Sequence, residues 1–436
     1  MVAKPEIEHG LSALATVLEG AISLRRWSPG TATNALELHP LPPDWTPPQA
    51  FAWLPVTELD TVCLPPGTVG RLRYASQRSW AQWMEDWAGR PGTPVHGSAA
   101  PWAQSDWYPQ FTEWVSLSLA GRHIDPQGAA VPVQQWGISA VYRQRTSAGD
   151  FFAKAVRRGV AGRLGEPLFG HEPAITRALA EMSPRRLPHV FDADSAHGWL
   201  ITADASITAI RHLPYDKWEL GVLALAEVQK AWIGQEERLT SLGCADRRPG
   251  RLTRLLSSAP GRRPVICAEL PPEAARREDL WAAIADLCGL LEAGPVPSTV
   301  THGDFHAGNV GLRPDNSTCI IDWSYAALGH PFLDAWLYIH RLPEVWRTRV
   351  AETYLNEWRD AAPIAELHRM LDAAGVVSAL HQVLTYGEII DSLEPTEQSD
   401  FDPIRLRWWR RAVDSWNRYE TRYCHETGRV LGPDLQ

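Results

Sequence analysis

The sequence predicts an α+β protein with a small antiparallel sheet followed by a helix-rich region. From Trp218 onward, apolar residues recur at helical spacing, except around residues 301–323. Residues 1–95 are rich in Pro, Gly and Trp and precede this pattern. The strands of the sheet are predicted from four short runs rich in apolar residues, separated by turn residues, at 139–146, 150–156, 188–191 and 198–203.

We expect three segments along the chain. Residues 1–95 form an extension or small module, residues 96–204 hold the sheet and a preceding helix, and residues 205–436 form the helical part. In the extension we expect a helix near Leu11–Leu24 and a short strand and turn at Phe51–Leu59. The latter faintly resembles the end of some Nudix domains. The Nudix catalytic box is absent from the sequence, so no pyrophosphatase activity is predicted.

The helix before the sheet is expected at Tyr108–Arg122, because Phe111, Trp114, Val115 and Leu119 fall on one face. The first two strands should form a hairpin, since Ser147-Ala148-Gly149 is a short turn between two extended runs.

One lysine, Lys154, interrupts the apolar strand of this hairpin. A buried ammonium group is costly unless a charged partner compensates. Glu172 opens a helical run eighteen residues later and can be that partner, with Glu166 and Glu181 as rivals. Two other interpretations stay open. Lys154 can extend from an edge strand into water, and Glu172 can be an acid favoured by the helix dipole.

The segment Thr301–Asn309 reads T-H-G-D-F-H-A-G-N and is followed by Cys-Ile-Ile-Asp-Trp at 319–323. It places Asn309 five positions after Asp304, and Asp322 thirteen positions further on, behind a short apolar strand. Phosphoryl transfer needs such a set. One carboxylate orients and deprotonates an attacking hydroxyl, and two oxygen ligands hold magnesium.

A zinc site is the competing interpretation of this segment, because His302 and His306 are four residues apart. Gly303 and Gly308 favour a loop, and no third His, Cys or Glu ligand is nearby in the sequence. We therefore expect His302 to brace the loop by hydrogen bonds.

The whole constellation resembles the aminoglycoside phosphotransferase and choline kinase family, whose catalytic loop reads H-G-D-x-x-x-x-N and which has a bilobal protein-kinase-like fold. The resemblance covers roughly residues 130–395. It implies that Asp304 is the catalytic base and that Asn309 and Asp322 hold Mg²⁺, with ATP or GTP as phosphoryl donor.

The resemblance also assigns nucleotide contacts in the first lobe. Lys154 would contact the α- and β-phosphates, oriented by Glu172, and Ser139 would meet the phosphates from a reduced glycine loop at 136–140. Asp204 falls in the expected linker between the lobes, where adenine is bound by backbone groups.

The sequence departs from the protein kinases in two ways. Gly303 replaces the Arg of H-R-D, so control by activation-loop phosphorylation is not expected. About ten residues separate Asp322 from Asp334, too few for a peptide-docking loop, which favours a small-molecule acceptor. Asp334 is expected to start a helix and brace the catalytic loop.

The acceptor is expected to be an aminoglycoside-like antibiotic, a sugar or another hydroxylated metabolite. The resemblance suggests Tyr386, Glu388 and Asp391 as contacts to a cationic acceptor, whereas the open alternative for this acidic stretch is a solvated helix end. Alternative functions are a nucleotide-binding pseudokinase or assembly module without turnover, a protein kinase, or an adenylyl transferase.

The composition narrows the partners. The net charge of −9 argues against nucleic acid, and no apolar run is long enough to span a membrane. Six scattered cysteines without C-x-x-C pairs indicate reduced thiols and a cytoplasmic location, and most of the 21 Trp residues are expected in the core. Oligomeric state and the choice between ATP and GTP are left undecided.

Overall fold

The structure is a computed structural model of residues 1–436. Beyond five strands between residues 2 and 52, it describes residues 101–103, 107–135, 138–159, 168–257, 278–392 and 402–424. The chain divides into two compact units, residues 1–154 with 393–401, and residues 155–392 with 402–436.

The N-terminal segment contains strands where a helix was expected. The antiparallel strands β2 and β3 pair from Ser12 with Trp27 to Leu18 with Ala21, so the helix predicted near Leu11–Leu24 is wrong. The apolar residues there also fit a period of two, and a run this short cannot distinguish the two periods. Of the expected strand at Phe51–Leu59, only its first two residues are described, and they form β5. The strands of this segment are β1 (Val2–Ala3), β2 (Ser12–Leu18), β3 (Ala21–Trp27), β4 (Leu38–Pro40) and β5 (Phe51–Ala52).

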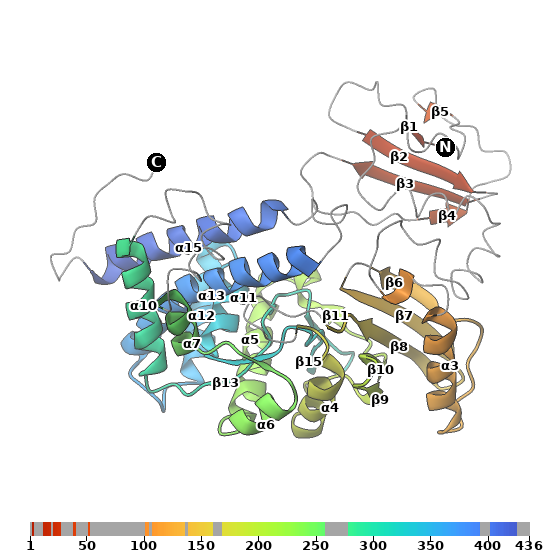
Figure 1. Cartoon of the computed structure of the whole chain (residues 1–436), viewed down its shortest axis with the longest axis horizontal. Coiled ribbons are helices and arrows are strands. Elements are labelled where there is room, and N and C mark those ends of the chain that lie inside the picture. Colours follow the sequence, from red (N-terminus) through yellow and green to blue (C-terminus); the bar gives the residue numbers. More distant parts are fainter. Residues whose placement is uncertain are drawn as a thin grey trace. The chain divides into compact units, whose positions relative to one another are not determined.

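The predicted sheet and its preceding helix are confirmed. α3 (Trp107–Ala120) buries Phe111, Val115 and Leu119, the apolar face expected from their spacing. β7 and β8 form the expected hairpin, and the strand order is β6-β7-β8-β10-β9 (Figure 1). The strands are β6 (Val131–Gln135), β7 (Ser139–Thr146), β8 (Gly149–Val156), β9 (Val190–Asp194) and β10 (Trp199–Ala203).

The second unit is helix-rich, as predicted. α13 packs along α15 and α11, and α10 packs against α7. Its described helices are α4 (Glu172–Met182), α5 (Trp218–Ala231), α6 (Glu236–Ser241), α7 (Pro249–Ser257), α10 (Glu278–Glu292), α11 (Phe332–Ile339), α12 (Glu344–Asn356), α13 (Ile364–Ser392) and α15 (Asp402–Tyr423). Short 3-10 turns lie at Pro101–Ala103, Ile210–His212 and Tyr215–Lys217.

Two small sheets in this unit flank the predicted catalytic loop. One has the order β11-β14-β15 and the other β12-β16-β13, so the loop at 302–309 leaves β13 and enters β14. The strands are β11 (Thr208–Ala209), β12 (Ala245–Asp246), β13 (Thr299–Thr301), β14 (Val310–Leu312), β15 (Thr318–Ile320) and β16 (Ala327–Gly329).

The core beneath this loop is aromatic. Phe305 stacks on Tyr338 with ring centroids 5.0 Å apart, and both side chains are fully buried with Trp323 and Phe332. Burial of such large rings stabilises the loop from below and fixes where its polar residues emerge.

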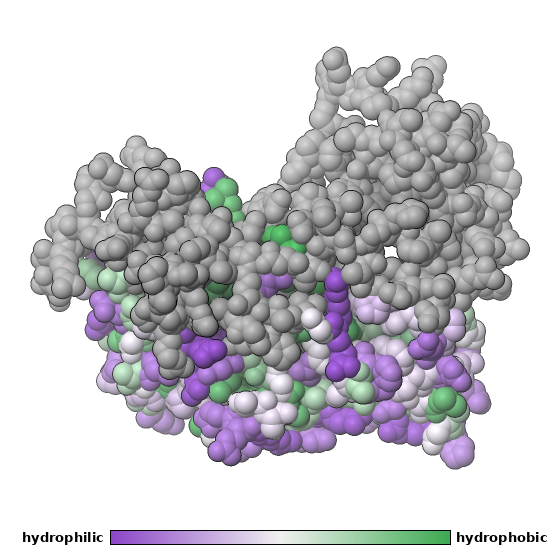
Figure 2. All heavy atoms as spheres, viewed as in Figure 1, coloured by the Kyte–Doolittle hydropathy of each residue, from purple (hydrophilic) through white to green (hydrophobic). Residues whose placement is uncertain are grey.

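The described surface drawn in Figure 2 is mainly polar. Among the described residues on the face in Figure 2, hydrophilic side chains predominate and hydrophobic ones form small separate patches. No helix in the described part of the chain is long and apolar enough to cross a membrane.

Candidate active site

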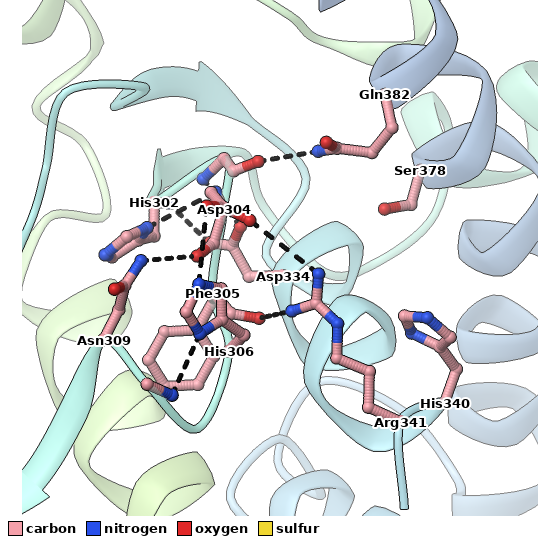
Figure 3. A network of polar contacts seen from close by, with 12 residues as sticks. His302, Asp304, Phe305, His306, Asn309, Asp334, His340, Arg341, Ser378 and Gln382 are labelled. Atoms are coloured by element: carbon pink, nitrogen blue, oxygen red, sulfur yellow. Dashed lines mark hydrogen bonds and ion pairs between the residues drawn. The ribbon is translucent and has the colours of Figure 1, made fainter. Parts of the chain in front are cut away.

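One buried carboxylate holds the start of the catalytic loop. Asp334, in the first turn of α11, is 0% exposed, and its two oxygens accept the backbone N–H groups of His302 at 2.6 Å and Gly303 at 2.9 Å (Figure 3). Gln229 donates to it at 3.4 Å. Burial raises the pKa of Asp334 to about 7, and the bonds from the loop oppose that rise. The helix that carries Asp334 thereby sets the position of the loop.

Gly303 allows the loop to run close to the chain that follows Asp322. Its φ is +80°, in the left-handed region, and a Cβ at this position would lie 2.5 Å from the carbonyl oxygen of Tyr325. Only glycine meets both conditions without strain. The close approach and the positive φ therefore explain why a glycine stands where the protein kinases have Arg.

His302 links the loop to the strand before Asp322. Its Nε2 donates to the carbonyl oxygen of Ile321 at 2.9 Å, and its Nδ1 accepts the backbone N–H of Asp304 at 3.3 Å. Because both ring nitrogens are engaged and the side chain is fully buried, His302 is not available as a metal ligand. This removes the zinc interpretation of the His302/His306 pair.

The Asp304 carboxylate projects from this loop and is 26% exposed. Its Oδ1 lies 3.8 Å from the Arg341 guanidinium and its Oδ2 lies 3.6 Å from Nε2 of His306. Desolvation raises the pKa of Asp304 to about 7, Arg341 opposes this, and Asp322 adds to it. A carboxylate with a pKa near neutral is suited to accept a proton.

His306 is a neutral neighbour of Asp304. Its Nδ1 accepts the backbone N–H of Gly308 at 2.9 Å, so the ring proton is assigned to Nε2, the nitrogen on the Asp304 side. Burial lowers the pKa of His306 to about 3, and the charge of Arg341 lowers it further. The ring can donate a hydrogen toward the carboxylate without adding a charge.

The pairing of β14 with β15 brings the two candidate metal ligands to one place. Val310 pairs with Ile320, and the pairing continues outward because Ile321 donates to the carbonyl oxygen of Asn309 at 2.9 Å. Asp322 follows directly, with a φ of +66°. Ser324 Oγ donates to Asp322 Oδ1 at 2.8 Å. Asn309 and Asp322 therefore flank the same end of this hairpin.

The donor set at this place fits magnesium. Nδ2 of Asn309 donates to the Asp304 carbonyl oxygen at 3.1 Å, so its Oδ1 is the atom that could serve as a ligand together with the Asp322 carboxylate. Mg²⁺ takes one or two such oxygen ligands and completes its shell with phosphates and water. The described residues hold no cluster of three or more His, Cys, Asp or Glu suited to a protein-only metal site.

Two residues of the site were missed by the sequence analysis. Arg341 lies beside Asp304, and its Nη1 donates to the carbonyl oxygen of Phe305 at 3.4 Å. Gln382 of α13 donates to the carbonyl oxygen of Gly303 at 2.7 Å. Their signals were weak: Arg341 stands two helical turns after Asp334, and Gln382 is a lone buried amide in an apolar helix.

The family model described as "Phosphotransferase enzyme family" matches residues 135–372, more than half of the chain. The chain belongs to the phosphotransferase enzyme family. These enzymes are ATP-dependent phosphotransferases that act on hydroxyl groups. The α+β architecture expected from the sequence is confirmed by the described strands and helices.

Solved structures similar to this phosphotransferase have low sequence identity. A macrolide 2'-phosphotransferase type I is 15% identical, with 68% of this chain and 96% of that chain covered and a TM-score of 0.46. The choline kinase LicA from Streptococcus pneumoniae is 13% identical, with 71% and 100% covered and a TM-score of 0.47. A search of curated proteins found no match. The family assignment therefore rests on the family model.

The predicted nucleotide contacts of this phosphotransferase fall in both units. Lys154 is half-buried on β8 in the first unit, and Glu172 is buried at the start of α4 in the second. Ser139 is the buried first residue of β7. Asp204 follows β10 and is exposed, and its carboxylate accepts a hydrogen bond from the backbone N–H of Ser206 at 2.8 Å. Their roles, and the lobe boundary near 204, stay predictions.

The predicted acceptor residues differ in their surroundings. Tyr386 is partly buried. Burial and the charge of Asp304 raise the pKa of its hydroxyl, whereas the charges of Arg341 and two further arginines lower it. Glu388 is only 3% exposed and forms an ion pair with Arg247 at 3.5 Å, so its charge is already compensated. Asp391 belongs to α13, but its side chain lies outside the described residues.

Proposed function

We propose that this phosphotransferase is a small-molecule kinase in which Asp304 is the general base. The acceptor hydroxyl oxygen attacks the γ-phosphorus of ATP or GTP and forms the new P–O bond. The bond to the β,γ-bridging oxygen breaks, and the nucleoside diphosphate leaves with that electron pair. The hydroxyl proton passes to the Asp304 carboxylate, so charge and atoms balance.

The observation that carries this proposal is the arrangement of one partly exposed carboxylate with two oxygen ligands at the end of one hairpin. Asp304 has a pKa of about 7, so it accepts a proton more readily than an ordinary carboxylate and is still partly ionised at neutral pH. Backbone bonds from Asn309, His302 and Gly303 fix the loop. Such positioning supplies most of the acceleration in a loose phosphoryl-transfer transition state.

Asn309 and Asp322 would hold Mg²⁺, which supplies charge neutralisation for the triphosphate when bound. Lys154, oriented by Glu172, would add positive charge at the α- and β-phosphates, with Ser139 and the backbone near Asp204 completing the nucleotide site. Support for these roles is the family membership and the position of each residue on its expected element.

The acceptor is proposed to be a small hydroxylated molecule. α11 begins at Phe332, ten residues after Asp322, so the protein has no room there for a peptide-docking loop. Aminoglycoside-like antibiotics, sugars and other hydroxylated metabolites all meet this requirement.

The test is label transfer with the full chain, Mg²⁺ and a panel of hydroxylated acceptors. Label from γ-labelled ATP or GTP should appear in a small molecule, and label from the α-position should not. Label on protein would indicate a protein kinase, α-label in the product an adenylyl transferase, and Mg²⁺-dependent binding without turnover a pseudokinase.

A further inference from the structure

Three arginines lie near Asp304 or near its neighbours: Arg341 is 3.8 Å from the Asp304 carboxylate, and Arg407 and Arg411 are within electrostatic range of Tyr386. Arg341 follows α11, and Arg407 and Arg411 lie in the first three turns of α15. In Figure 3, Asn309 and Arg341 lie on opposite sides of Asp304. Arg341 therefore lies on the side of Asp304 away from Asn309, one of the two predicted metal ligands.

A buried tryptophan holds two of these cations in place. The guanidinium carbons of Arg341 and Arg411 lie 6.0 and 4.6 Å from the centre of the Trp408 ring, so they are no further apart than these two distances together. Trp408 is 3% exposed. Stacking on a fixed ring orders long side chains that would otherwise move.

Electrostatic effects on the pKa values connect these charged groups to one another. Asp322 acts on Asp304, and Asp304 acts on Arg341 and Tyr386. These two in turn act on Arg411, as does Arg407. Asp304 and Arg411 are therefore both within electrostatic range of Tyr386, and Arg341 is within range of both Asp304 and Arg411.

Negative charge does not balance this cluster within the residues that the structure describes. Asp304 is the one carboxylate that acts on Arg341, and no described acid forms an ion pair with Arg407 or Arg411. Burial lowers the pKa of Arg411 from its ordinary value, and repulsion by Arg341 and Arg407 lowers it further. Like charges held close together favour binding of an anion.

We propose that the acceptor of this enzyme carries an anionic group, a carboxylate or a phosphate ester, which Arg407 and Arg411 bind with Arg341 while its hydroxyl reaches Asp304. This rests on the proposed function and reverses the cationic acceptor expected from the sequence. Glu388, the acid expected to bind a cationic acceptor, is instead paired with Arg247. Guanidinium groups suit carboxylate and phosphate because they bind both in a two-pronged manner.

The test compares four acceptor probes that share one ring: D-glucose, D-glucosamine, D-glucuronate and D-glucose 6-phosphate. Binding to the full chain is measured by calorimetry at constant ionic strength, with Mg²⁺ and a non-hydrolysable ATP analogue present. At least one anionic probe should bind about tenfold or more tightly than glucose, with glucosamine weakest. Whichever anionic probe binds more tightly shows whether the acceptor carries a carboxylate or a phosphate ester.

Substitutions of the two arginines test whether they are the groups that bind the anion. Arg407→Gln and Arg411→Gln should each weaken binding of the preferred anion about tenfold and leave glucose unchanged. The matched control is Arg418→Gln, because Arg418 is exposed on the same helix and bonds to Ser415. It should keep the preference.

The outcomes separate this inference from the proposed function. If the nucleotide analogue binds with Mg²⁺ but the anionic probes show no advantage, including when no probe binds, the anionic acceptor is rejected and the kinase assignment stands. A preference that survives in both variants also rejects it. Failure of the nucleotide itself to bind would count against the proposed function.

Discussion

The loop that carries Asp304 and the helix α15 hold their polar groups in different ways: the loop fixes them by bonds to the backbone, and the helix presents its charges on long side chains. On the loop side, His302, Asn309 and Asp334 each bond to main-chain atoms. On the α15 side, Arg411 is held by stacking on Trp408. The difference indicates that the loop holds its residues in a rigid arrangement. Side chains on α15 can therefore be replaced without disturbing that arrangement.

The largest expected effect is on the loop side, at the proposed base. Asp304→Asn keeps the size of the side chain but removes its capacity to take a proton. We expect turnover to fall by at least about a hundredfold while nucleotide affinity changes little, measured by steady-state kinetics and calorimetry. Asp315→Asn is the control, because Asp315 lies in the exposed turn between β14 and β15. Near-normal activity of Asp304→Asn would reject the assigned base.

The second effect concerns the metal. Asp322→Ala removes a charged oxygen ligand, so nucleotide binding should no longer depend on Mg²⁺ in calorimetric titrations. Ser324→Ala removes only the hydroxyl that bonds to Asp322, and it should retain the Mg²⁺ dependence with weaker affinity. Unaltered Mg²⁺-dependent binding in Asp322→Ala would count against the metal role.

The rigidity of the loop is tested by two glycines with the same backbone conformation. Gly303 and Gly128 have φ values of +80° and +79°, but a Cβ meets Tyr325 at Gly303 and nothing within 4 Å at Gly128. Both Ala variants should lose about 1 kcal/mol from the left-handed conformation. Gly303→Ala should lose about 1–3 kcal/mol more by overpacking, measured by denaturant unfolding. Equal losses would show that the close approach at Gly303 contributes nothing.

The smallest effect connects the two sides through Arg341. Its charge lowers the pKa of Asp304 against the rise caused by burial. In Arg341→Gln the pKa of Asp304 should therefore rise further, and because the base must be ionised, the acid limb of the kcat/KM profile should move to higher pH. Arg347→Gln, which loses bonds only to the carbonyl oxygens of Leu342 and His340, should leave the limb in place. A shift to lower pH in Arg341→Gln would contradict the electrostatic account.

The predictability of each region follows from how local its contacts are. Asp304, Asn309 and Asp322 lie within nineteen residues, and a strand pairing that the apolar pattern reveals brings them together. Arg341 and Gln382 reach the loop from the end of α11 and from α13, and tertiary packing that no local period encodes places them there. The burial of Glu388 against Arg247 was hidden for the same reason.

Secondary structure followed the same rule. Long periodic helices such as α10 and α12 were predicted, because several apolar residues in each recur at helical spacing. The β2–β3 hairpin was taken for a helix because its runs of seven residues fit either period.

The central claim is tested most directly by a crystal structure with Mg²⁺ and a non-hydrolysable ATP analogue. We expect a metal ion about 2.0–2.1 Å from Asn309 Oδ1 and from an Asp322 carboxylate oxygen. The Asp304 carboxylate should face the γ-phosphate without binding the metal. A metal ion held by other residues, or one ligated by Asp304, would contradict the account.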